Sequence, residues 1–287
     1  MATKKIAVFG ATGTSGGGAM RKFIEAGWEV RAVTRDKSSD KSKAIAAKGA
    51  TVVEADLDNR ATIRSAIEGC DAVYYTGPSL GNRFDIGQAV QGINAADAAA
   101  EVGIGHFIFQ SALSHKSGKG VLSLGSKRAI EERLAELHLP TTITRPSLFM
   151  DNFLTFFPVQ KDGDNLSIAM ALPGNKVQGM VCSDDIGNAA VAVASNPQKY
   201  IGADIDLIAD SVSFDDMASI IGDLAGKKCT AISLPLEVLE EHWPQGVDLY
   251  KWLSSDPESY NAQALADLIG KPIDFRSWAQ QHILPTL

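Results

Sequence analysis

A glycine-rich turn near the amino terminus constrains the fold of this chain more than any other feature. It reads Gly-Ala-Thr-Gly-Thr-Ser-Gly over residues 10–16 and follows the apolar run Ile-Ala-Val-Phe at 6–9. A helical pattern comes next, and the spacing predicts a helix beginning near Gly17. In such a GxxGxxG turn one glycine allows the tight bend, another lets the backbone approach a pyrophosphate, and the third lets helix and strand pack closely.

The turn predicts a dinucleotide site at a helix amino terminus, where N–H groups and the helix dipole attract phosphate. The alternative is an ordinary glycine-rich connection, because the chain has 26 glycines. Its place after the first strand of a strand–helix series favours the site. Backbone and hydroxyl groups of the turn are the expected phosphate contacts, from Gly10, Thr12, Gly13, Thr14, Ser15 and Gly16.

The first half of the chain alternates short apolar runs with helical patterns. The runs predict strands at 6–9, 30–33, 51–54, 72–75, 106–110 and 141–144. Apolar runs without polar alternation are typical of parallel strands that are buried on both faces. Alternation with helices then predicts an α/β fold, a Rossmann-type doubly wound parallel sheet built from right-handed crossovers.

Beyond residue 145 frequent prolines break the pattern into shorter elements. Strands are expected at 179–182, 205–208 and 230–234, and helices at 185–194, 214–224, 236–242 and 260–269. We therefore expect an NAD(P)-binding Rossmann domain at 1–150 and a smaller carboxy-terminal lobe at 151–287 that binds a substrate or a partner. Such lobes interleave with the sheet, so the boundary is soft.

Charge and cysteine content exclude several classes of protein. The formal charge of −7 disfavours nucleic acid, which needs a positive surface. Three widely spaced cysteines, Cys70, Cys182 and Cys229, fit neither a metal-ligand spacing nor a disulfide framework. No signal peptide and no run of roughly 18 apolar residues is visible. The expectation is a soluble cytoplasmic protein with no metal and no membrane contact.

The end of the second predicted strand indicates which cofactor is bound. NAD-specific folds carry Asp or Glu there to bind the ribose 2′-hydroxyl, whereas this chain has Thr34 and Arg35. A guanidinium suits a 2′-phosphate, which favours NADP(H). Because Asp36 follows, NAD(H) stays open, and so does the alternative that Arg35 is only a solvated loop charge.

These motifs together resemble the NmrA-like family, an atypical branch of the short-chain dehydrogenase/reductase superfamily. The matching positions are 8–13, 35, 54–58, 126–131, 144–146, 151–152 and 185–187. The resemblance implies a sheet of order 3-2-1-4-5-6. It also implies cofactor contacts at the ends of the third and fourth strands, near the nicotinamide ribose and beyond residue 145, from Asp56, Leu57, Thr76, Gly77, Pro78, Lys127, Phe149 and Asn152.

One departure concerns the reaction itself. Active short-chain dehydrogenases resemble one another in a Tyr-x-x-x-Lys pair, but four residues before Lys127 this chain has Ser123. A serine hydroxyl has too high a pKa to replace tyrosine as a general acid. The remaining catalytic candidates are Lys127, Ser111 and His115, although His115 also fits a surface loop. The aromatic and methionine residues at 149–157 fit either a wall for a flat substrate or simple core.

The resemblance implies an NADPH-dependent oxidoreductase that reduces a small, conjugated, hydrophobic acceptor such as a quinone, a dye or an imine. Hydride transfer to such an acceptor needs chiefly positioning, so no strong protein acid is required. The alternative is a catalytically silent redox sensor that binds NADP(H) and a partner protein. A third is an isomerase or dehydratase that uses the cofactor transiently. Each is compatible with a homodimer.

Overall fold

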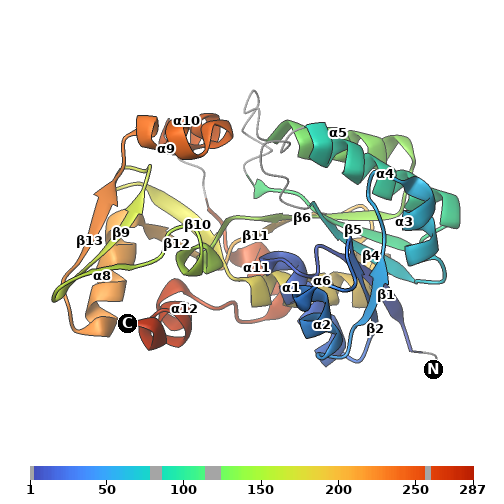
Figure 1. Cartoon of the computed structure of the whole chain (residues 1–287), viewed down its shortest axis with the longest axis horizontal. Coiled ribbons are helices and arrows are strands. Elements are labelled where there is room, and N and C mark those ends of the chain that lie inside the picture. The colour runs from blue at the N-terminus through green and yellow to red at the C-terminus, as the bar shows by residue number, and fades with distance from the viewer. Residues whose placement is uncertain (1–2, 78–85, 114–123, 256–259) are drawn as a thin grey trace. The chain divides into compact units, whose positions relative to one another are not determined.

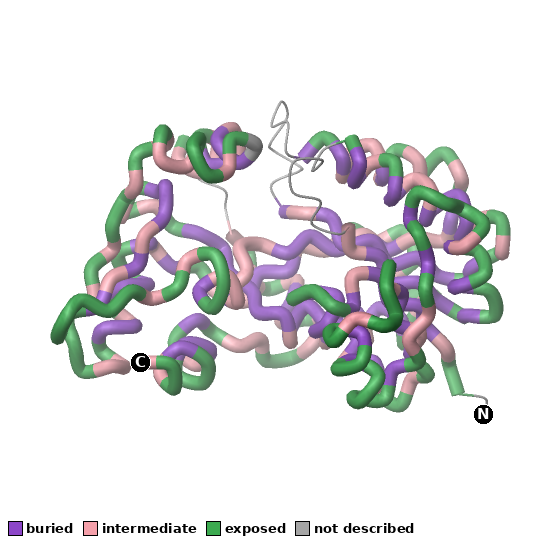
Figure 2. The backbone as a smooth tube through the Cα atoms, in the orientation of Figure 1, coloured by how far each residue is buried: buried purple, intermediate pink, exposed green. Residues whose placement is uncertain are grey.

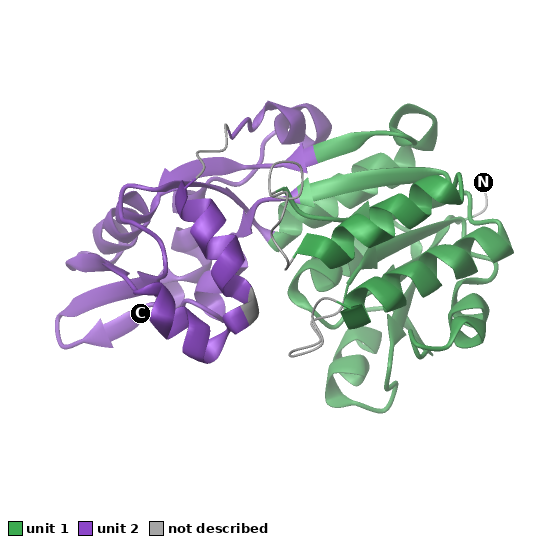
Figure 3. Cartoon of the chain, turned by 90° about the horizontal axis from the view of Figure 1, so that it is seen from above, with its two compact units in different colours: residues 1–115, 124–145, 183–205 green, residues 116–123, 146–182, 206–287 purple. Residues whose placement is uncertain are grey.

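The computed structural model describes residues 3–77, 86–113, 124–255 and 260–287 (Figure 1). The chain forms two compact units, and neither is continuous in sequence (Figure 3). Unit 1 comprises residues 1–115, 124–145 and 183–205, and unit 2 comprises residues 116–123, 146–182 and 206–287. The segment 183–205 therefore returns to unit 1 after the chain has entered unit 2.

A seven-stranded sheet of order β11-β6-β5-β4-β1-β2-β3 forms the centre of unit 1. The strands are β1 (Lys5–Phe9), β2 (Glu29–Thr34), β3 (Thr51–Glu54), β4 (Ala72–Thr76), β5 (His106–Gln110), β6 (Thr141–Pro146) and β11 (Asp204–Leu207). Neighbours from β3 to β6 pair in parallel. The predicted fold class and the order 3-2-1-4-5-6 are confirmed, and β11 adds a strand beside β6.

Helices cover both faces of this sheet. α1 (Thr14–Glu25) and α6 (Ser183–Ser195) lie on one face, and α3 (Arg60–Ile67), α4 (Ile86–Val102) and α5 (Gly125–Glu136) lie on the other (Figure 1). Two short helices, α2 (Asp40–Ala46) and α7 (Pro197–Tyr200), complete the unit. The central strands are buried almost throughout, as expected of a sheet covered on both faces (Figure 2).

The first helix begins earlier than the sequence pattern predicts. α1 starts at Thr14 rather than near Gly17, because Gly13 is extended and its carbonyl oxygen accepts the Gly17 N–H at 2.9 Å. Gly16 therefore lies in the first helical turn. A Cβ there would stand 2.3 Å from the Gly10 carbonyl oxygen, so only glycine allows this helix to approach the strand end.

Glycines also let α1 and α6 cross at close range. A Cβ on Gly18 would lie 2.2 Å from the carbonyl oxygen of Ser183, and one on Gly187 would lie 2.7 Å from that of Gly18. Both clashes are with backbone, which cannot turn aside as a flexible side chain can. The helix that follows the phosphate turn is thus held against the first helix of the returning segment.

Unit 2 contains two small sheets and a set of short helices. One sheet has β7 (Leu148–Phe149), β10 (Val177–Val181) and β12 (Asp210–Ser213), and the other has β8 (Gln160–Asp162), β9 (Asn165–Met170) and β13 (Cys229–Ser233). The helices are α8 (Phe214–Ala225), α9 (Leu236–His242), α10 (Val247–Ser255), α11 (Gln263–Ile269) and α12 (Phe275–His282), with 3-10 turns η4 (Met150–Leu154), η5 (Pro244–Gly246) and η6 (Leu284–Thr286).

The aromatic segment at 149–157 divides between core and surface. Met150 and Phe153 are buried in the core of unit 2, and the Phe153 ring lies 5.4 Å from the Phe275 ring. Phe156 is 75% exposed. The core interpretation therefore holds for Met150 and Phe153, and the continuous aromatic wall is not formed by these residues as one set.

Three further observations concern the described part of the chain. Cys70, Cys182 and Cys229 form no disulfide bond. Residues 3–77, 86–113, 124–255 and 260–287 contain no helix both long and apolar enough to cross a bilayer. The same ranges contain no group of three His, Cys, Asp or Glu side chains placed to hold a metal ion.

Candidate functional site

The glycine turn lies at the carboxyl ends of β1 and β4, where the strand order of the sheet reverses. Gly10 has φ +70°, in the left-handed region that favours glycine. A Cβ on Gly10 would stand 2.7 Å from the Thr76 Cγ2 atom and 3.3 Å from the Thr76 carbonyl oxygen. The turn therefore passes directly over the end of β4, and such a switch point is where doubly wound sheets bind ligands.

No side chain caps the amino terminus of α1. In contrast, Ser39 caps α2 and Asn59 caps α3, each by accepting a backbone N–H. The first N–H groups of a helix have no acceptor within the helix, so those of α1 remain for a ligand. Thr12, Gly13 and Thr14 are exposed around them. This turn can hold a pyrophosphate.

The Ser15 hydroxyl has a different place from the rest of the turn. It donates a hydrogen bond to the Gln110 side-chain oxygen, which also accepts one from the Tyr74 hydroxyl. The two hydroxyl oxygens lie 3.3 Å apart, and all three side chains are buried. We call Ser15, Tyr74 and Gln110 the neutral cluster. It supports the turn from beneath, and only the Ser15 backbone N–H is directed to the helix terminus.

Arg35 and Asp36 differ in how they are engaged at the end of β2. Arg35 is exposed and makes no hydrogen bond or ion pair with any described residue. The Asp36 carboxylate accepts hydrogen bonds from the Ser38 hydroxyl at 2.6 Å and the Ser38 N–H at 2.8 Å, and these bonds lower the pKa of Asp36. The Asp36 carboxylate thus stabilises its own loop, whereas the Arg35 guanidinium is available to a ligand.

The predicted cofactor contacts Asp56 and Leu57 lie just beyond the end of β3. Asp56 is exposed, and its carboxylate accepts the Asp58 N–H at 2.9 Å. The Leu57 side chain is buried in the core, and its carbonyl oxygen accepts the Asn94 amide at 2.9 Å. Both residues lie on the same edge of the sheet as the glycine turn, because β3 runs parallel to β2 and β1.

Thr76 and Gly77 follow β4 beside the turn. A Cβ on Gly77 would lie 2.9 Å from atoms of the Gln88 side chain, which also accepts the Ser126 hydroxyl at 2.8 Å. Gly77 therefore lets the chain leave the sheet close to α4 and α5. Pro78, the next predicted contact, lies outside the described residues.

An ion cluster centred on the buried Arg145 joins the ends of β5 and β6 to α5. Arg145, 3% exposed, donates to Glu131 at 2.8 and 2.9 Å and to Asp204 at 2.7 and 3.0 Å. The Ser111 hydroxyl donates to Glu131 and accepts from Arg145 at 3.1 Å. We call Ser111, Glu131, Arg145 and Asp204 the charged cluster. The hydroxyl proton of Ser111, a predicted catalytic residue, is thus committed to Glu131.

Lys127 lies one helical turn before Glu131, in the first turn of α5. It is partly buried, with its ammonium nitrogen 5.9 Å from the centre of the Phe109 ring on β5. Burial lowers the pKa of Lys127 to about 8; Glu131 works against this shift and Arg145 adds to it. The ammonium makes no ion pair within the described ranges, which leaves its three donors to a ligand.

The remaining predicted residues belong to unit 2 or lie outside the described residues. Phe149 and Asn152 belong to unit 2, on β7 and η4, and the Asn152 carbonyl oxygen accepts the N–H groups of residues 155–157. His115 and Ser123 lie outside the described residues. Unit 1 thus carries the turn, Arg35, Asp56, Leu57, Thr76, Gly77, Ser111 and Lys127.

Sequence reasoning missed the residues that hold this site together. Gln110 and Asp204 were assigned no role, and Glu131 and Arg145 were noted only as parts of matching motifs. A signal was present for Glu131, because positions four apart on a helix share a face and Lys127 precedes it by four. No local signal exists for Asp204, which is 59 residues from its partner Arg145.

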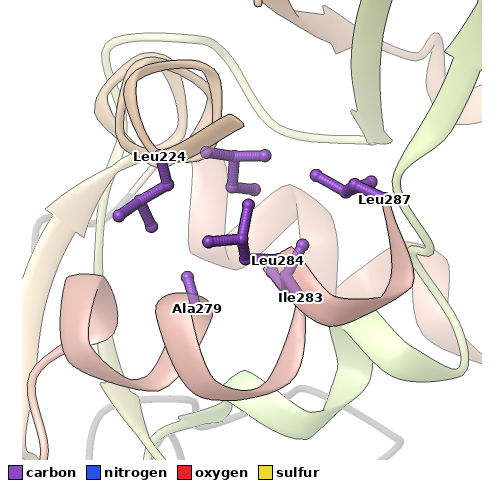
Figure 4. Close-up of a pocket in the computed structure, with 6 residues that line it drawn as sticks. Leu224, Ala279, Ile283, Leu284 and Leu287 are labelled. Atoms are coloured by element: carbon purple, nitrogen blue, oxygen red, sulfur yellow. The ribbon is translucent and has the colours of Figure 1, made fainter. Parts of the chain in front are cut away.

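A shallow apolar dent in unit 2, with no interior space for a water molecule, is a separate feature (Figure 4). It lies between α8, α12 and η6 and is lined only by aliphatic side chains, those of Ile221, Leu224, Ala279, Ile283, Leu284 and Leu287. Ligand sites combine an apolar wall with a few polar groups that fix orientation. This lining has none.

Comparison with known proteins assigns the chain to a family. The family model described as NmrA-like matches residues 2–255. The chain belongs to the NmrA-like family. Among curated relatives, the NmrA-like family domain-containing oxidoreductase FrzB of a Cladobotryum species is 28% identical over 254 residues, covering 78% of this chain and 74% of the relative. The same type of oxidoreductase from Aspergillus japonicus, himF, is 30% identical over 81% of this chain and 77% of its own length.

Solved structures of NmrA-like and related folds superpose along almost the whole chain. Triphenylmethane reductase of Citrobacter sp., complexed with NADP(H), has a TM-score of 0.79 at 21% identity and covers 96% of this chain and 99% of its own. The NADPH-dependent quinone oxidoreductase QOR2 of Escherichia coli has 0.81 at 22%, covering 97% and 99%. The negative transcriptional regulator Nmra, in complex with NAD, has 0.83 at 19%, covering 100% and 97%. At these identities the likeness is one of fold.

Proposed function

We propose that this NmrA-like protein is an NADPH-dependent reductase of a small, conjugated, hydrophobic acceptor. The observation that carries the proposal is the pairing of an uncapped α1 terminus, under a glycine turn at the β1–β4 switch point, with an unpaired Arg35 at the end of the neighbouring strand. A pyrophosphate and a 2′-phosphate are the two anionic parts of NADP(H), and these groups are suited to each.

The comparisons support the reductase class. The two curated relatives carry the name oxidoreductase, and two of the similar folds are named as reductases that use NADPH. Their substrates, a triphenylmethane dye and a quinone, are conjugated acceptors by name. We infer the same substrate class for this chain.

In the proposed complex each residue has a binding or orienting task. The N–H groups of Thr14, Ser15 and Gly16 hold the pyrophosphate, and Arg35 holds the 2′-phosphate. Lys127 donates to the ribose hydroxyls and so orients the nicotinamide ring, which supplies the hydride. A conjugated acceptor spreads the added charge, so water completes the protonation and the commitment of Ser111 to Glu131 does not block turnover.

The test of the reductase function is turnover with a panel of quinones, triphenylmethane dyes, imines and conjugated aldehydes. Loss of NADPH absorbance is followed with and without each acceptor. We expect turnover with at least one acceptor and slower turnover with NADH. No turnover of any acceptor, together with tight NADPH binding, would count against the enzyme and in favour of the regulator described below.

Gly13→Val tests whether the turn binds the cofactor. A Cβ on Gly13 would stand 3.3 Å from the Gly10 carbonyl oxygen, so the apo protein can adjust by a few tenths of an ångström. The added methyl groups occupy the space of the pyrophosphate, and NADPH binding should fall below detection by calorimetry. Wild-type affinity in a folded variant would remove the turn from the site.

Arg35→Ala tests the choice between NADP(H) and NAD(H). We expect NADPH affinity to fall roughly tenfold to a hundredfold, the range of a charge-assisted hydrogen bond, and NADH affinity to change little. Lys37→Ala, on the same loop, is the matched control and should affect both cofactors weakly. Equal losses for both cofactors in Arg35→Ala would mean that Arg35 contacts the adenine or the fold.

A second candidate function is a regulator that reads the NADPH/NADP⁺ ratio and binds a partner protein. The specific observation in its favour is the Ser111 hydroxyl, which is committed to Glu131 and so offers no proton to a substrate. A regulator of this kind should bind NADPH and NADP⁺ with affinities that differ by about tenfold or more, so that the ratio shifts its population. If the protein fails the turnover test, calorimetry with NADPH and with NADP⁺ decides whether it is such a regulator.

A further inference from the structure

The charged cluster contains more interactions than a helix–sheet contact needs. Arg145 uses all five of its N–H donors: Nε and one Nη2 hydrogen on Asp204, the other on Glu131, and the Nη1 pair on Glu131 and Ser111. A buried ion pair is often no more stabilising than apolar packing of equal volume. Three of these interactions converge on the Glu131 carboxylate, which raises the question of what that carboxylate would bind without Arg145.

Glu131 is the carboxylate on α5 that Lys127 could reach. The two residues are four apart on the helix, a spacing at which Lys and Glu side chains pair on one face. Both Glu131 oxygens are instead occupied by Arg145, and one also accepts the Ser111 hydroxyl. Within the part of the chain that the structure describes, the Lys127 ammonium has no ion pair.

We propose that Arg145 is a positioning residue for Lys127: by occupying the Glu131 carboxylate, it prevents that carboxylate from capturing the ammonium and keeps the ammonium available to a cofactor ribose. The cofactor half of this inference rests on the proposed function. The competition among Arg145, Glu131 and Lys127 does not, because it concerns only side chains of unit 1.

On α5 itself, the neighbouring Arg128 is a cation whose buried Nη2 has no hydrogen-bond partner among the described residues, and the carboxylates of α4 are already paired. On α4, which packs against α5, Asp97 binds Arg60 and Arg133, and Glu101 binds Arg60 and Arg64. β5 presents the Phe109 ring rather than a charge, and β6 presents Arg145 itself. Burial is the main cause of the Lys127 pKa of about 8, Glu131 is the acid that opposes this shift, and Arg145 adds to it.

The first experiment measures Lys127 in the protein without cofactor. Trinitrobenzenesulfonate reacts only with unprotonated amines, and peptide mass spectrometry gives the modified fraction of Lys127 against pH, with the exposed Lys43 as internal standard. In wild type the half-maximal pH should lie near 8. In Arg145→Met the released Glu131 captures the ammonium, and this midpoint should rise by about one pH unit.

A double variant separates capture from simple damage to the fold. Arg145→Met/Glu131→Gln removes the Glu131 carboxylate together with the Arg145 guanidinium that occupies it. The pH midpoint of Lys127 modification should therefore return to about the wild-type value or below. NADPH affinity should fall about tenfold in Arg145→Met and recover to within about threefold of wild type in the double variant. A purely structural role predicts that the double variant is no better than the single one.

Arg133→Met is the matched control. It removes a different arginine, on α5 rather than β6, that also binds a buried carboxylate, but this carboxylate, Asp97, lies on α4 and not on the helix of Lys127. The Lys127 midpoint and NADPH affinity should both stay at their wild-type values. A shift as large as that of Arg145→Met would mean that any loss of charge in α5 has the effect, and would overturn the proposal.

Two outcomes of the main experiment also overturn it: an unchanged Lys127 midpoint in folded Arg145→Met, or a double variant as weak as the single one. If Arg145→Met does not fold, Glu131→Gln decides, because removing the carboxylate should move the Lys127 midpoint to lower pH, and an unchanged midpoint contradicts the proposal. Failure of wild type to bind NADPH would refute the proposed function while the amine titration still reports on Arg145.

Discussion

Two polar clusters lie at the same edge of the unit 1 sheet, on opposite faces, and they differ in charge. The neutral cluster, on the face of α1, joins Ser15, Tyr74 and Gln110 beneath the glycine turn. The charged cluster, on the face of α5, joins Ser111, Glu131, Arg145 and Asp204 beside Lys127. Each ties a helix to the carboxyl ends of the strands, α1 through Ser15 in its first turn and α5 through Glu131 in its middle.

The difference fits the ligands that we propose for the two regions. A negative charge under the turn would repel a pyrophosphate and compete for the N–H groups proposed to hold it, and neutral side chains avoid both effects. Beside Lys127 the requirement is the opposite, since an amine is controlled by the charges around it. The neutral cluster therefore suits the proposed anion site, and the charged cluster suits control of the Lys127 ammonium.

The largest expected effect on stability comes from removing one charge of the charged cluster. Glu131→Leu leaves the buried Arg145 with only Asp204, and breaking a buried pair in this way typically lowers the free energy of unfolding by about 3–5 kcal/mol. Gln110→Leu is the counterpart in the neutral cluster and should cost about 1 kcal/mol, because Ser15 and Tyr74, 3.3 Å apart, can bond each other. Denaturant unfolding followed by circular dichroism measures both.

Equal losses in these two variants would contradict the distinction between charged and neutral support. A larger loss in Gln110→Leu would mean that the glycine turn, rather than the ion cluster, holds the sheet edge together. Wild-type secondary structure in both variants before unfolding is the control that the comparison requires.

The next prediction concerns the other end of β5, where acid pH tests the role of a buried histidine. The buried His106 accepts no proton readily, because burial lowers its pKa to about 4 from an ordinary 6.5. Thr142 gives its hydroxyl proton to the Tyr200 carbonyl oxygen, so the Nε2 of His106 must donate to Thr142, and Nδ1 has no partner among the described residues. This end of the strand depends on a histidine that stays neutral.

The direction in which stability changes with pH follows from proton uptake by the unfolded chain. Below pH 6.5 the unfolded chain takes up a proton that folded His106 refuses until about pH 4, so stability is full above 6.5 and falls as the pH decreases toward 4. The fall attributable to His106 is about 3 kcal/mol. The difference between wild type and His106→Gln in unfolding free energy at each pH isolates it, and parallel curves would contradict the prediction.

The sequence predicts unit 1 well because short apolar runs mark its strands, and the central strands are buried on both faces. All six strands from β1 to β6 were located, and β3 and β5 agree to the residue. In unit 2 the β8 strand Gln160–Asp162 is exposed at every position, so no apolar pattern marks it. The helix α12 was also missed, although Asp274 caps it and Phe275 and Trp278 form a buried pair three residues apart.

The candidate site shows a similar limit. Glycine turns and strand ends are local, so Gly10, Gly13, Gly16 and Arg35 can be identified from neighbouring residues. The charged cluster assembles segments near residues 111, 131, 145 and 204, which meet only because β5, β6 and β11 lie side by side. A pairing across such distances has no local sequence pattern. The role of each of these residues in cofactor binding stays a prediction.

The smallest expected effect comes from two adjacent tyrosines on β4, whose side chains point to opposite faces of the sheet. Both are fully buried, but Tyr74 donates to Gln110 in the neutral cluster, whereas the Tyr75 hydroxyl has no partner among the described residues. Tyr75 lies among aromatic rings, 5.4 Å from Phe9. Loss of the same oxygen atom should therefore have opposite consequences at neighbouring positions.

Tyr74→Phe should lower the free energy of unfolding by about 1 kcal/mol, the net value of a buried hydrogen bond. Tyr75→Phe should raise it by about 1 kcal/mol, because it removes a buried hydroxyl that gains nothing on folding and keeps the ring packing. Denaturant unfolding of the two variants side by side measures the pair with volume and ring held constant. A loss of stability in both would mean that the Tyr75 hydroxyl has a bonding partner, and the α5 face of β4 would then not be the purely apolar surface that the contrast requires.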